Sequence, residues 1–333
     1  MTKDNPSPKP KILVARAIFP EALAKLEESF EVRSNQADHV WTPEELKKEL
    51  ASVAGALVTG SERIDAGALS QAAKLKIVAN ISVGYNNFDI QAITAAGVMA
   101  TNTPEVLTDT TADFGFALLM ATARRVTESE HWLRAGNWLK WSIASNPLGV
   151  DVHHTTLGII GMGRIGQGIA KRALGFDMNV IYYNRSRLSE THEKACQATY
   201  VSKEELLRTA DHVVLVLPYT AQNHHTIGAK EIALMKPTAT LINIARGGIV
   251  DDAALAQALK EKRLFAAGLD VFEGEPQVHP ELLKLSNVVL APHIASSTEK
   301  TRRAMVDLAI DNLSAALAGK KPPSLINEEV FKG

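Results

Sequence analysis

The chain has 333 residues, and at the usual size of protein domains this length predicts about two domains. Hydrophobic residues make up 46% and charged residues 22% of it, which excludes a mainly disordered or collagen-like chain. The 36 Lys and Arg residues against 37 Asp and Glu residues leave a formal net charge of -1, so no overall basic field would attract nucleic acid or an anionic membrane.

The N-terminal segment and the cysteine content indicate the compartment. Residues 1–11 carry three prolines among polar residues and no apolar run, which predicts a loose tail and not a signal peptide. The most apolar stretch, residues 114–123, is too short to span a bilayer. The only cysteine, Cys196, has no partner for an intramolecular disulfide, which is typical of a reducing compartment. We therefore expect a soluble cytoplasmic protein that does not bind membranes.

Short apolar runs alternate with helix-like segments along the chain, the pattern that builds parallel sheets covered by helices. In the first part, expected strands are separated by helical stretches such as residues 43–52. Those strands are residues 12–15, 56–58, 77–80 and 98–100. Together they predict a small doubly wound α/β unit.

A long apolar helix is expected next. Pro104 would occupy its first helical position, with Glu105 near the positive end of the helix dipole, and the helix would run to about Val126. Because the segment is apolar on nearly all sides, we expect it to be buried. Residues 127–154 show no regular pattern and are expected to be irregular.

A second set of six expected strands would form a full dinucleotide-binding sheet. These strands are residues 157–161, 180–183, 213–217, 240–244, 268–271 and 288–291. The last helix, residues 298–317, has apolar residues near one face and is expected to return to the first unit. We therefore predict a discontinuous domain of residues 1–103 and 295–333, with a second α/β domain of residues 104–294 inserted into it.

A glycine-rich motif, GMGRIG at residues 161–166, directly follows an expected strand and opens a helix. In a dinucleotide-binding loop the first glycine allows the turn, the second lets the backbone approach the pyrophosphate, and the third lets the helix meet the strand. Similar glycine triplets also occur in ordinary tight turns, but the strand before and the helix after favour dinucleotide binding. The residues expected to contact the cofactor here are Gly161, Gly163, Arg164 and Ile165.

The end of the next expected strand points to the type of cofactor. Asn184 stands where an NAD-dependent enzyme would place an acidic residue on the ribose diol. With Arg185, Ser186 and Arg187 it offers hydrogen-bond donors and positive charge where a 2′-phosphate would lie. This favours NADP(H), with NAD(H) as the alternative. The ordinary interpretation is that Arg185 and Arg187 are solvated loop arginines.

Three later segments fall at the ends of expected strands, where cofactors bind in sheets of this kind. Arg246 comes just past one strand, Glu275 lies in the loop after another, and His293 follows the last strand. Each has an ordinary explanation by itself, as a surface arginine, a loop carboxylate and a capping histidine. Together they match ketone reduction, which needs a cation for a substrate carboxylate, an acid for the carbonyl oxygen and a partner that keeps this acid protonated.

After the tail, the sequence resembles the D-isomer-specific 2-hydroxyacid dehydrogenase family over essentially its whole length. The likeness rests on residues 81–89, 121–125 and 151–154, on the glycine motif, and on the segments around Arg246, Glu275 and His293. It implies a Rossmann-type cofactor domain inserted into a flavodoxin-like substrate domain. It also implies an enzyme that reduces small 2-oxoacids, such as glyoxylate, hydroxypyruvate or 2-ketogluconate, to D-2-hydroxyacids with NADPH.

The resemblance also implies roles for single residues. His293 would protonate the carbonyl oxygen as hydride arrives from the nicotinamide, and Glu275 would bind its other ring nitrogen and raise its pKa. Arg246 would bind the substrate carboxylate, as would the backbone N–H groups of Val83 and Gly84, in a cleft between the domains.

Further residues are expected around the cofactor on the same resemblance. Asp270 would accept a hydrogen bond from the nicotinamide amide. The residues expected to line the cofactor are Leu217, Pro218, Ile244 and Ala245.

Three of the four tryptophans, Trp132, Trp138 and Trp141, lie in the irregular stretch, which suggests an interface. In similar reductases this region crosses to the partner subunit, so Trp141 would reach the partner's active site in a homodimer. A purely structural dimer contact is the other interpretation.

No metal site is expected. The adjacent pairs His153-His154 and His224-His225 would have diverging side chains, without carboxylate or cysteine ligands at matching spacing.

Two other interpretations of the whole chain stay open. Corepressors of the C-terminal-binding type resemble the same family, so the chain could be a nucleotide-sensing scaffold. It could also be an NAD-dependent D-2-hydroxyacid dehydrogenase. A corepressor would bind a short peptide and reduce small oxoacids poorly, so turnover separates the two classes.

Overall fold

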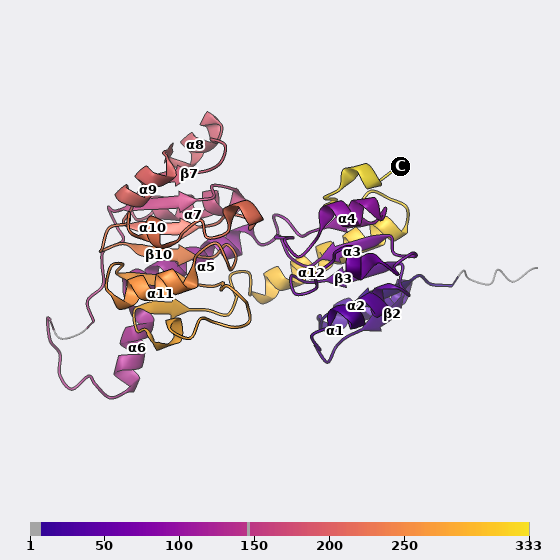
Figure 1. The fold of residues 1–333 in the computed structure, drawn as a ribbon, viewed down its shortest axis with the longest axis horizontal. Helices are drawn as coiled ribbons and strands as arrows, with labels where there is room; N and C mark the ends of the chain where they lie inside the picture. The colour runs from indigo at the N-terminus through magenta and orange to yellow at the C-terminus, as the bar shows by residue number, and fades with distance from the viewer. Residues whose placement is uncertain (1–7, 145–146, 333) are drawn as a thin grey trace, which may run out of the picture. The chain divides into compact units, whose positions relative to one another are not determined.

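The computed structural model describes residues 8–144 and 147–332 (Figure 1). They form two compact units: the smaller holds the described residues up to Leu107 and from Thr298 onward, and the larger is Thr108–Ser297. These divisions fall a few residues later in the chain than the boundaries expected from the sequence. Residues 1–7 of the expected tail lie outside the described residues, and Lys11 already belongs to the first strand.

The smaller unit contains a five-stranded sheet in the order β2-β1-β3-β4-β5, with every neighbouring pair parallel. Its strands are β1 (Lys11–Val14), β2 (Glu31–Ser34), β3 (Gly55–Val58), β4 (Ile77–Asn80) and β5 (Met99–Thr101). Four of them were expected from the sequence. The strand β2 was missed because its sequence, EVRS, is mostly exposed at the sheet edge and lacks an apolar run.

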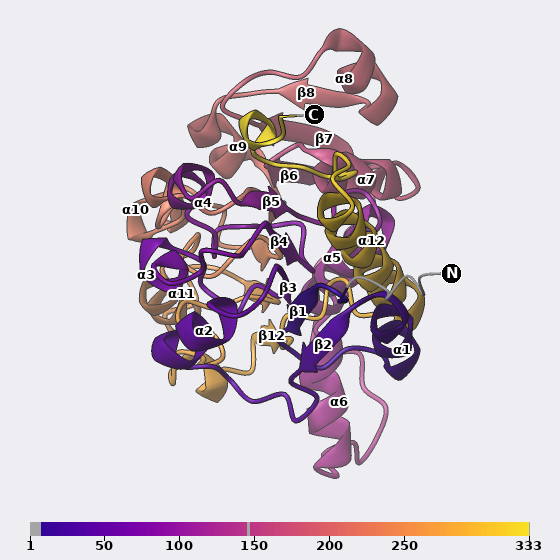
Figure 2. The ribbon, with the colours of Figure 1, turned by 90° about the vertical axis from the view of Figure 1, so that its right-hand side faces the viewer.

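Helices cover both faces of this sheet (Figure 2). They are α1 (Pro20–Ser29), α2 (Pro43–Leu50), α3 (Ala66–Leu69), α4 (Ile90–Ala95) and α12 (Glu299–Leu317), and the short helix η3 (Glu328–Val330) lies near the C-terminus. Apolar side chains of α1 and α12 pack on one face, and those of α2, α3 and α4 on the other. As expected, the last long helix returns to this unit, where α12 packs on β3 and β4.

The larger unit contains a seven-stranded parallel sheet in the order β12-β11-β10-β9-β6-β7-β8. Its strands are β6 (Thr156–Ile160), β7 (Asn179–Tyr183), β8 (Ala198–Tyr200), β9 (His212–Leu215), β10 (Thr240–Asn243), β11 (Ala266–Leu269) and β12 (Val288–Leu290). Six of these were expected, and the three-residue edge strand β8 was not. The strand order reverses between β6 and β9, and dinucleotides bind outside the carboxyl ends of the strands at such a point.

The helices of the larger unit form two layers. They are α5 (Thr108–Ala123), α6 (Val126–Arg134), α7 (Arg164–Leu174), α8 (Glu190–Cys196), α9 (Lys203–Thr209), α10 (Ala229–Ile232) and α11 (Asp252–Lys260), with the short helices η1 (Ala221–Asn223) and η2 (Leu282–Lys284). Buried residues of α5 and α7 pack on one face of the sheet, and those of α9, α10 and α11 on the other. Both faces of the sheet are therefore covered, as a parallel sheet requires.

The boundaries expected for the long apolar helix were wrong. It begins at Thr108, because Glu105 has a left-handed backbone (φ 72°) that no α-helix accommodates. It ends at Ala123 because Arg125 is also left-handed (φ 52°), and α6 then starts at Val126 and occupies the first residues of the stretch expected to be irregular. The expectation of burial was confirmed, since half of the helix's residues are buried.

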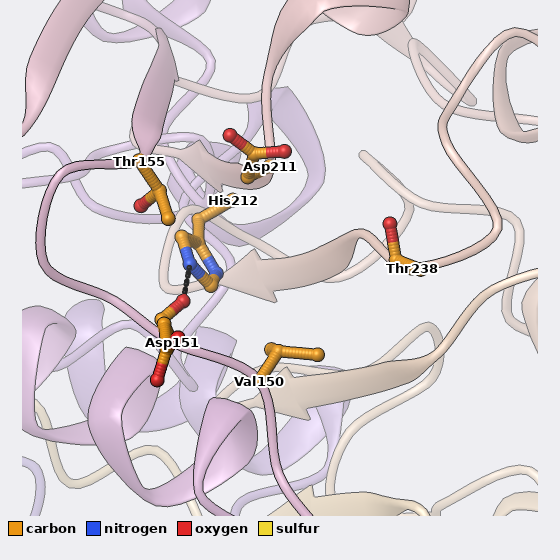
Figure 3. A pocket seen from close by; sticks show the side chains of 6 residues that line it. All are labelled: Val150, Asp151, Thr155, Asp211, His212 and Thr238. Carbon is orange, nitrogen blue, oxygen red and sulfur yellow. Dashed lines mark hydrogen bonds between the residues drawn. The ribbon is translucent and has the colours of Figure 1, made fainter.

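A small pocket lies at the amino-terminal edge of the larger sheet, around the starts of β6, β9 and β10 (Figure 3). The ring of His212 is fully buried there, with Nδ1 2.8 Å from the Thr240 hydroxyl and Nε2 3.1 Å from the Asp151 carbonyl oxygen. Burial lowers the pKa of His212, which favours its neutral form. Both ring nitrogens are occupied and the pocket is at the edge opposite to that where dinucleotides bind, so we assign His212 a structural role.

No helix within the described ranges has both the length and the apolar character needed to cross a membrane.

Candidate active site

The glycine loop between β6 and α7 leaves room for an anionic ligand. Gly161 has φ 104°, and a Cβ there would lie 2.6 Å from the Val216 carbonyl carbon, so the turn requires glycine. A Cβ on Gly163 would have no atom within 4 Å, so the start of α7 is open. Arg164 and Ile165 are the first residues of this 11-residue helix, whose N–H groups there have no intrahelical partner. These features fit the diphosphate of a dinucleotide.

Asn184 links this loop to the end of the next strand. Its side-chain oxygen accepts a hydrogen bond from the Met162 N–H at 2.6 Å, and its backbone carbonyl accepts one from the Tyr200 hydroxyl at 3.2 Å. The position that the sequence singled out for the adenosine ribose is therefore next to the phosphate loop and carries no charge.

The two arginines beyond Asn184 have different surroundings. Arg187 donates two hydrogen bonds to Glu193 at 2.8 and 2.9 Å, and the same carboxylate accepts one from the Tyr182 hydroxyl at 2.6 Å. The bonds from Arg187 and then Tyr182 lower the pKa of Glu193 to about 2, so the carboxylate stays ionised. Arg185 and Ser186 are exposed. Within the described part of the chain, Arg185 has no carboxylate within ion-pair distance.

The residues expected to take part in catalysis lie at the carboxyl edge of the same sheet. Arg246 follows β10, Asp270 follows β11, and His293 follows β12. Nδ1 of His293 lies 2.8 Å from a carboxylate oxygen of Glu275, and the other oxygen of Glu275 accepts the Phe272 N–H at 2.9 Å. The carboxylate is thus fixed in orientation. Among the described residues, Nε2 of His293 has no hydrogen-bond partner, and the side chain is 45% exposed.

The surroundings of Glu275 keep it ionised. Burial by itself would raise the pKa of Glu275, but the hydrogen bond from His293 and the charges of His293 and Arg246 together lower it. An ionised carboxylate accepts hydrogen bonds, so the Nδ1 proton of His293 points to Glu275 and Nε2 is the atom left to exchange a proton with a ligand.

Asp270 holds the loop that carries His293. One carboxylate oxygen accepts the Ile294 N–H at 2.7 Å and the other the Ala295 N–H at 2.9 Å, while its carbonyl accepts the His293 N–H at 2.8 Å. His293 has a left-handed backbone (φ 54°), which costs energy in a non-glycine residue and persists only when its surroundings hold it. The sequence suggested for Asp270 only a contact with the nicotinamide, so this role was missed.

Arg246 is carried on a loop that packs directly on the loop of Glu275. A Cβ on Gly247 would lie 1.8 Å from the Phe272 carbonyl oxygen, so only glycine permits this approach. Burial lowers the pKa of Arg246, and the charges of Glu275 and Asp270 oppose that shift. An arginine nevertheless stays protonated at neutral pH, so Arg246 supplies a positive charge beside the histidine and its carboxylate.

The structure also places the residues expected to line the cofactor. Leu217 and Pro218 follow β9, and a Cβ on Gly161 would lie 2.8 Å from the Leu217 nitrogen. Ile244 and Ala245 follow β10 and are buried. All four lie at the carboxyl edge that carries the glycine loop.

For three residues expected at the site, Val83, Gly84 and Trp141, no contact described within either unit links them to this edge. Val83 and Gly84 belong to the smaller unit, where their carbonyls accept hydrogen bonds from Asn102 at 2.8 Å and Asn80 at 3.1 Å. These asparagines were missed, although Asn80, a polar residue at the end of the apolar strand β4, is a usable signal for a loop-holding role. Trp141 is 73% exposed.

Comparisons with known proteins place the chain in a family. A sequence model of the D-isomer specific 2-hydroxyacid dehydrogenase, NAD binding domain, matches residues 116–295. The chain belongs to this family, which confirms the predicted membership, and it is an oxidoreductase with two parallel α/β sheets.

The names of individual relatives describe a narrower activity than the name of the family does. The chain is similar to glyoxylate reductases of Thermococcus onnurineus (48% identity, 97% of both chains) and Pyrococcus horikoshii (48% identity, 97% of this chain and 98% of the relative). It is also similar to the crystal structure of the NADPH-dependent glyoxylate/hydroxypyruvate reductase from Sinorhizobium meliloti in complex with NADP and malonate. That similarity has a TM-score of 0.87 and 34% identity over 98% of this chain and 99% of the other.

The open space at Gly163 gives a test of the cofactor loop. In Gly163→Ala the new methyl group would occupy the approach to the start of α7, so we expect dinucleotide binding to weaken about tenfold or more, which is ~1.4 kcal/mol or more, with an unchanged unfolding temperature. Fluorescence titration with NADPH and NADH, beside thermal unfolding, measures both. Gly175→Ala at the other end of α7, where a Cβ meets only the Arg172 carbonyl at 3.4 Å, is the control. Equal binding by Gly163→Ala and wild type would contradict this assignment.

Proposed function

We propose that this chain reduces small 2-oxoacids, among them glyoxylate, hydroxypyruvate and 2-ketogluconate, to D-2-hydroxyacids with NADPH. The observation that carries the proposal is the 2.8 Å contact between His293 and the ionised Glu275, beside Arg246 and at the same sheet edge as the glycine loop. The names of its relatives, glyoxylate reductases at 48% identity, support the substrate class.

Each residue has a role in the proposed reduction. When bound, the nicotinamide supplies the hydride. Arg246 offers a planar pair of N–H donors to the substrate carboxylate, which orients the ketone. His293 donates its Nε2 proton to the carbonyl oxygen, and Glu275 stabilises the ring while it carries two protons. We also propose that the N–H groups of Val83 and Gly84 bind the substrate carboxylate, and that Asp270 bonds the nicotinamide amide in addition to holding the loop.

Removing the acid should stop the reaction and spare the cofactor site. We expect His293→Ala to lower kcat by roughly 10²-fold or more with each of the three 2-oxoacids, because the variant lacks the imidazole that would protonate the carbonyl oxygen. NADPH oxidation at neutral pH measures the rate, and NADPH fluorescence measures cofactor binding, which should be unchanged. Full activity of His293→Ala would refute the proposal. Tight NADPH binding by the wild type without turnover of any of the substrates would favour the scaffold interpretation.

The preference for NADPH rests on Arg185. Asn184 carries no charge that would repel a phosphate, and the exposed guanidinium of Arg185 is not engaged by a carboxylate in the described residues. Arg187 is bound to Glu193. We therefore assign the 2′-phosphate contact first to Arg185 and Ser186, with Arg187 in a supporting role. The relative from Sinorhizobium meliloti is named as NADPH-dependent, which supports this choice over NAD(H).

A pair of substitutions separates the two arginines. Arg185→Ala should raise the KM for NADPH about tenfold, ~1.4 kcal/mol, and leave the KM for NADH nearly unchanged, because only NADPH carries the 2′-phosphate. Arg187→Ala is the matched control and should change the ratio of the two KM values less. Steady-state kinetics with both cofactors tests this. An equal effect of Arg185→Ala on the two cofactors would contradict the assignment.

We further propose that the chain forms a homodimer through the last turn of α6 and the segment that follows it. Large apolar side chains are exposed there to an extent that is unusual for a monomer. They are Leu133, Trp138, Leu139, Trp141, Ile143 and Leu148, with Leu139 90% exposed. In the dimer Trp141 would reach the partner's active site.

Reduction with NADPH and a single, buried free cysteine also fit a reducing cytoplasm, which we propose as the compartment.

The dimer has a direct test. The wild type should show twice the monomer mass in light scattering, and Leu139→Asp should show the monomer mass because it places a charge in the apolar contact. Trp141→Ala should stay dimeric and raise the KM for the 2-oxoacid. A monomeric wild type would contradict the dimer, and an unchanged KM in a dimeric Trp141→Ala would leave Trp141 a structural contact only.

A further inference from the structure

Three side chains outside the proposed catalytic group form a cluster that we call the His–His–Glu cluster: His224, His225 and Glu273. The two histidines follow η1, and Glu273 lies in the loop after β11. The rings of His224 and His225 stack with centroids 3.8 Å apart and planes at 23°. The sequence-based expectation that these side chains diverge was therefore wrong. His225 has a left-handed backbone (φ 50°), and its ring lies on the same side of the chain as the ring of His224.

Both rings present Nε2 to the carboxylate. Nε2 of His225 lies 3.0 Å from Oε2 and 3.2 Å from Oε1 of Glu273, and Nε2 of His224 lies 3.7 Å from the same Oε1. One nitrogen from each ring and one carboxylate oxygen all lie within 4.8 Å of one another. Metal–ligand bonds of about 2.0–2.2 Å need ligand atoms somewhat closer than this. The side chains are only partly buried, so small rotations that open the stacked rings can bring the three atoms around one ion.

The opposite nitrogens of both rings face polar groups. Nδ1 of His224 lies 3.2 Å from the Tyr219 hydroxyl, and Nδ1 of His225 lies 3.9 Å from a carboxylate oxygen of Asp251. Metal-binding histidines are commonly oriented in this way, by an oxygen on the nitrogen that does not bind the ion. The cluster thus has the ligand atoms, a hydroxyl within hydrogen-bond distance that would orient His224, and a carboxylate near His225.

We propose that the His–His–Glu cluster binds a divalent transition metal ion of the Zn²⁺ type. Two imidazole nitrogens and one carboxylate oxygen suit Zn²⁺, Co²⁺ or Ni²⁺ and suit Mg²⁺ or Ca²⁺ poorly, and three protein ligands leave a position for water. The bound ion joins the loop after β9 to the loop that carries Glu275. The loop of Arg246 is tied to the same place, because the His225 N–H donates to the Gly248 carbonyl at 2.7 Å. Metal binding therefore braces the loops that carry Arg246 and Glu275.

The other histidine pair provides a matched control. The rings of His153 and His154 are 5.1 Å apart at 86°, with their Nδ1 atoms 2.9 Å from each other. Their Nε2 atoms approach two different carboxylates, Asp151 at 3.8 Å and Asp177 at 3.7 Å. This pair offers adjacent histidines without a carboxylate shared by both rings.

The experiment uses the untagged full chain, stripped of metal with a chelator. It is titrated with Co²⁺, followed by its visible absorption, and with Zn²⁺, followed by calorimetry. We expect one equivalent of each ion to bind, and saturating Zn²⁺ to raise the unfolding temperature. His224→Gln and, separately, Glu273→Gln should weaken binding by roughly tenfold or more. The double variant His153→Gln/His154→Gln should bind like the wild type.

Three results would overturn the proposal. The first is no saturable binding of either ion by the wild type, and the second is equal binding by the wild type, His224→Gln and Glu273→Gln. Binding lost only in the His153→Gln/His154→Gln variant would move the ion to the other pair and would overturn it as well. Circular dichroism of each metal-free variant checks that it is folded. Because either single substitution at the cluster is informative, one misfolded variant still leaves a decisive measurement.

Discussion

The parallel direction of every strand in the larger sheet is the constraint on which the rest of this unit depends. Parallel strands bring all their carboxyl ends to one edge, and each return connection must cross a face of the sheet. Groups far apart in the sequence, from Gly161 to Arg246 and His293, therefore meet at that edge. The same constraint requires apolar helices on both faces, and α5 and α7 provide one of these layers.

Local backbone geometry then sets how the side chains meet at this edge. His293 and His225 both adopt left-handed conformations, and both are held by backbone hydrogen bonds to neighbouring loops. The strain at His293 is offset by the buried carboxylate of Asp270, which binds the two N–H groups that follow the histidine. A carboxylate expected from the sequence to contact a ligand thus holds the geometry of the loop that carries His293.

The sequence predicted the buried strands well, because runs of apolar residues covered on both faces leave a strong signal. It missed β2 and β8, which lie at sheet edges and are short or polar. It placed the start of α5 too early, because nothing local shows that Glu105 takes a positive φ. The pairing of His293 with Glu275 was predicted through the family resemblance and is present in the structure. The ion pair between Arg187 and Glu193 depends on where α8 packs, and no local sequence pattern reveals that position.

The discontinuous course of the chain has a consequence for how the protein is made. The helix α12 belongs to the smaller unit and covers the face of its sheet that carries Ile12 and Ile77, yet it is encoded almost at the end of the chain. During synthesis α1 can cover this face only in part, while the larger unit is contiguous and has all its strands and helices before α12 emerges. The smaller unit can therefore complete its core only after the whole larger unit has been synthesised, although its strands are made first.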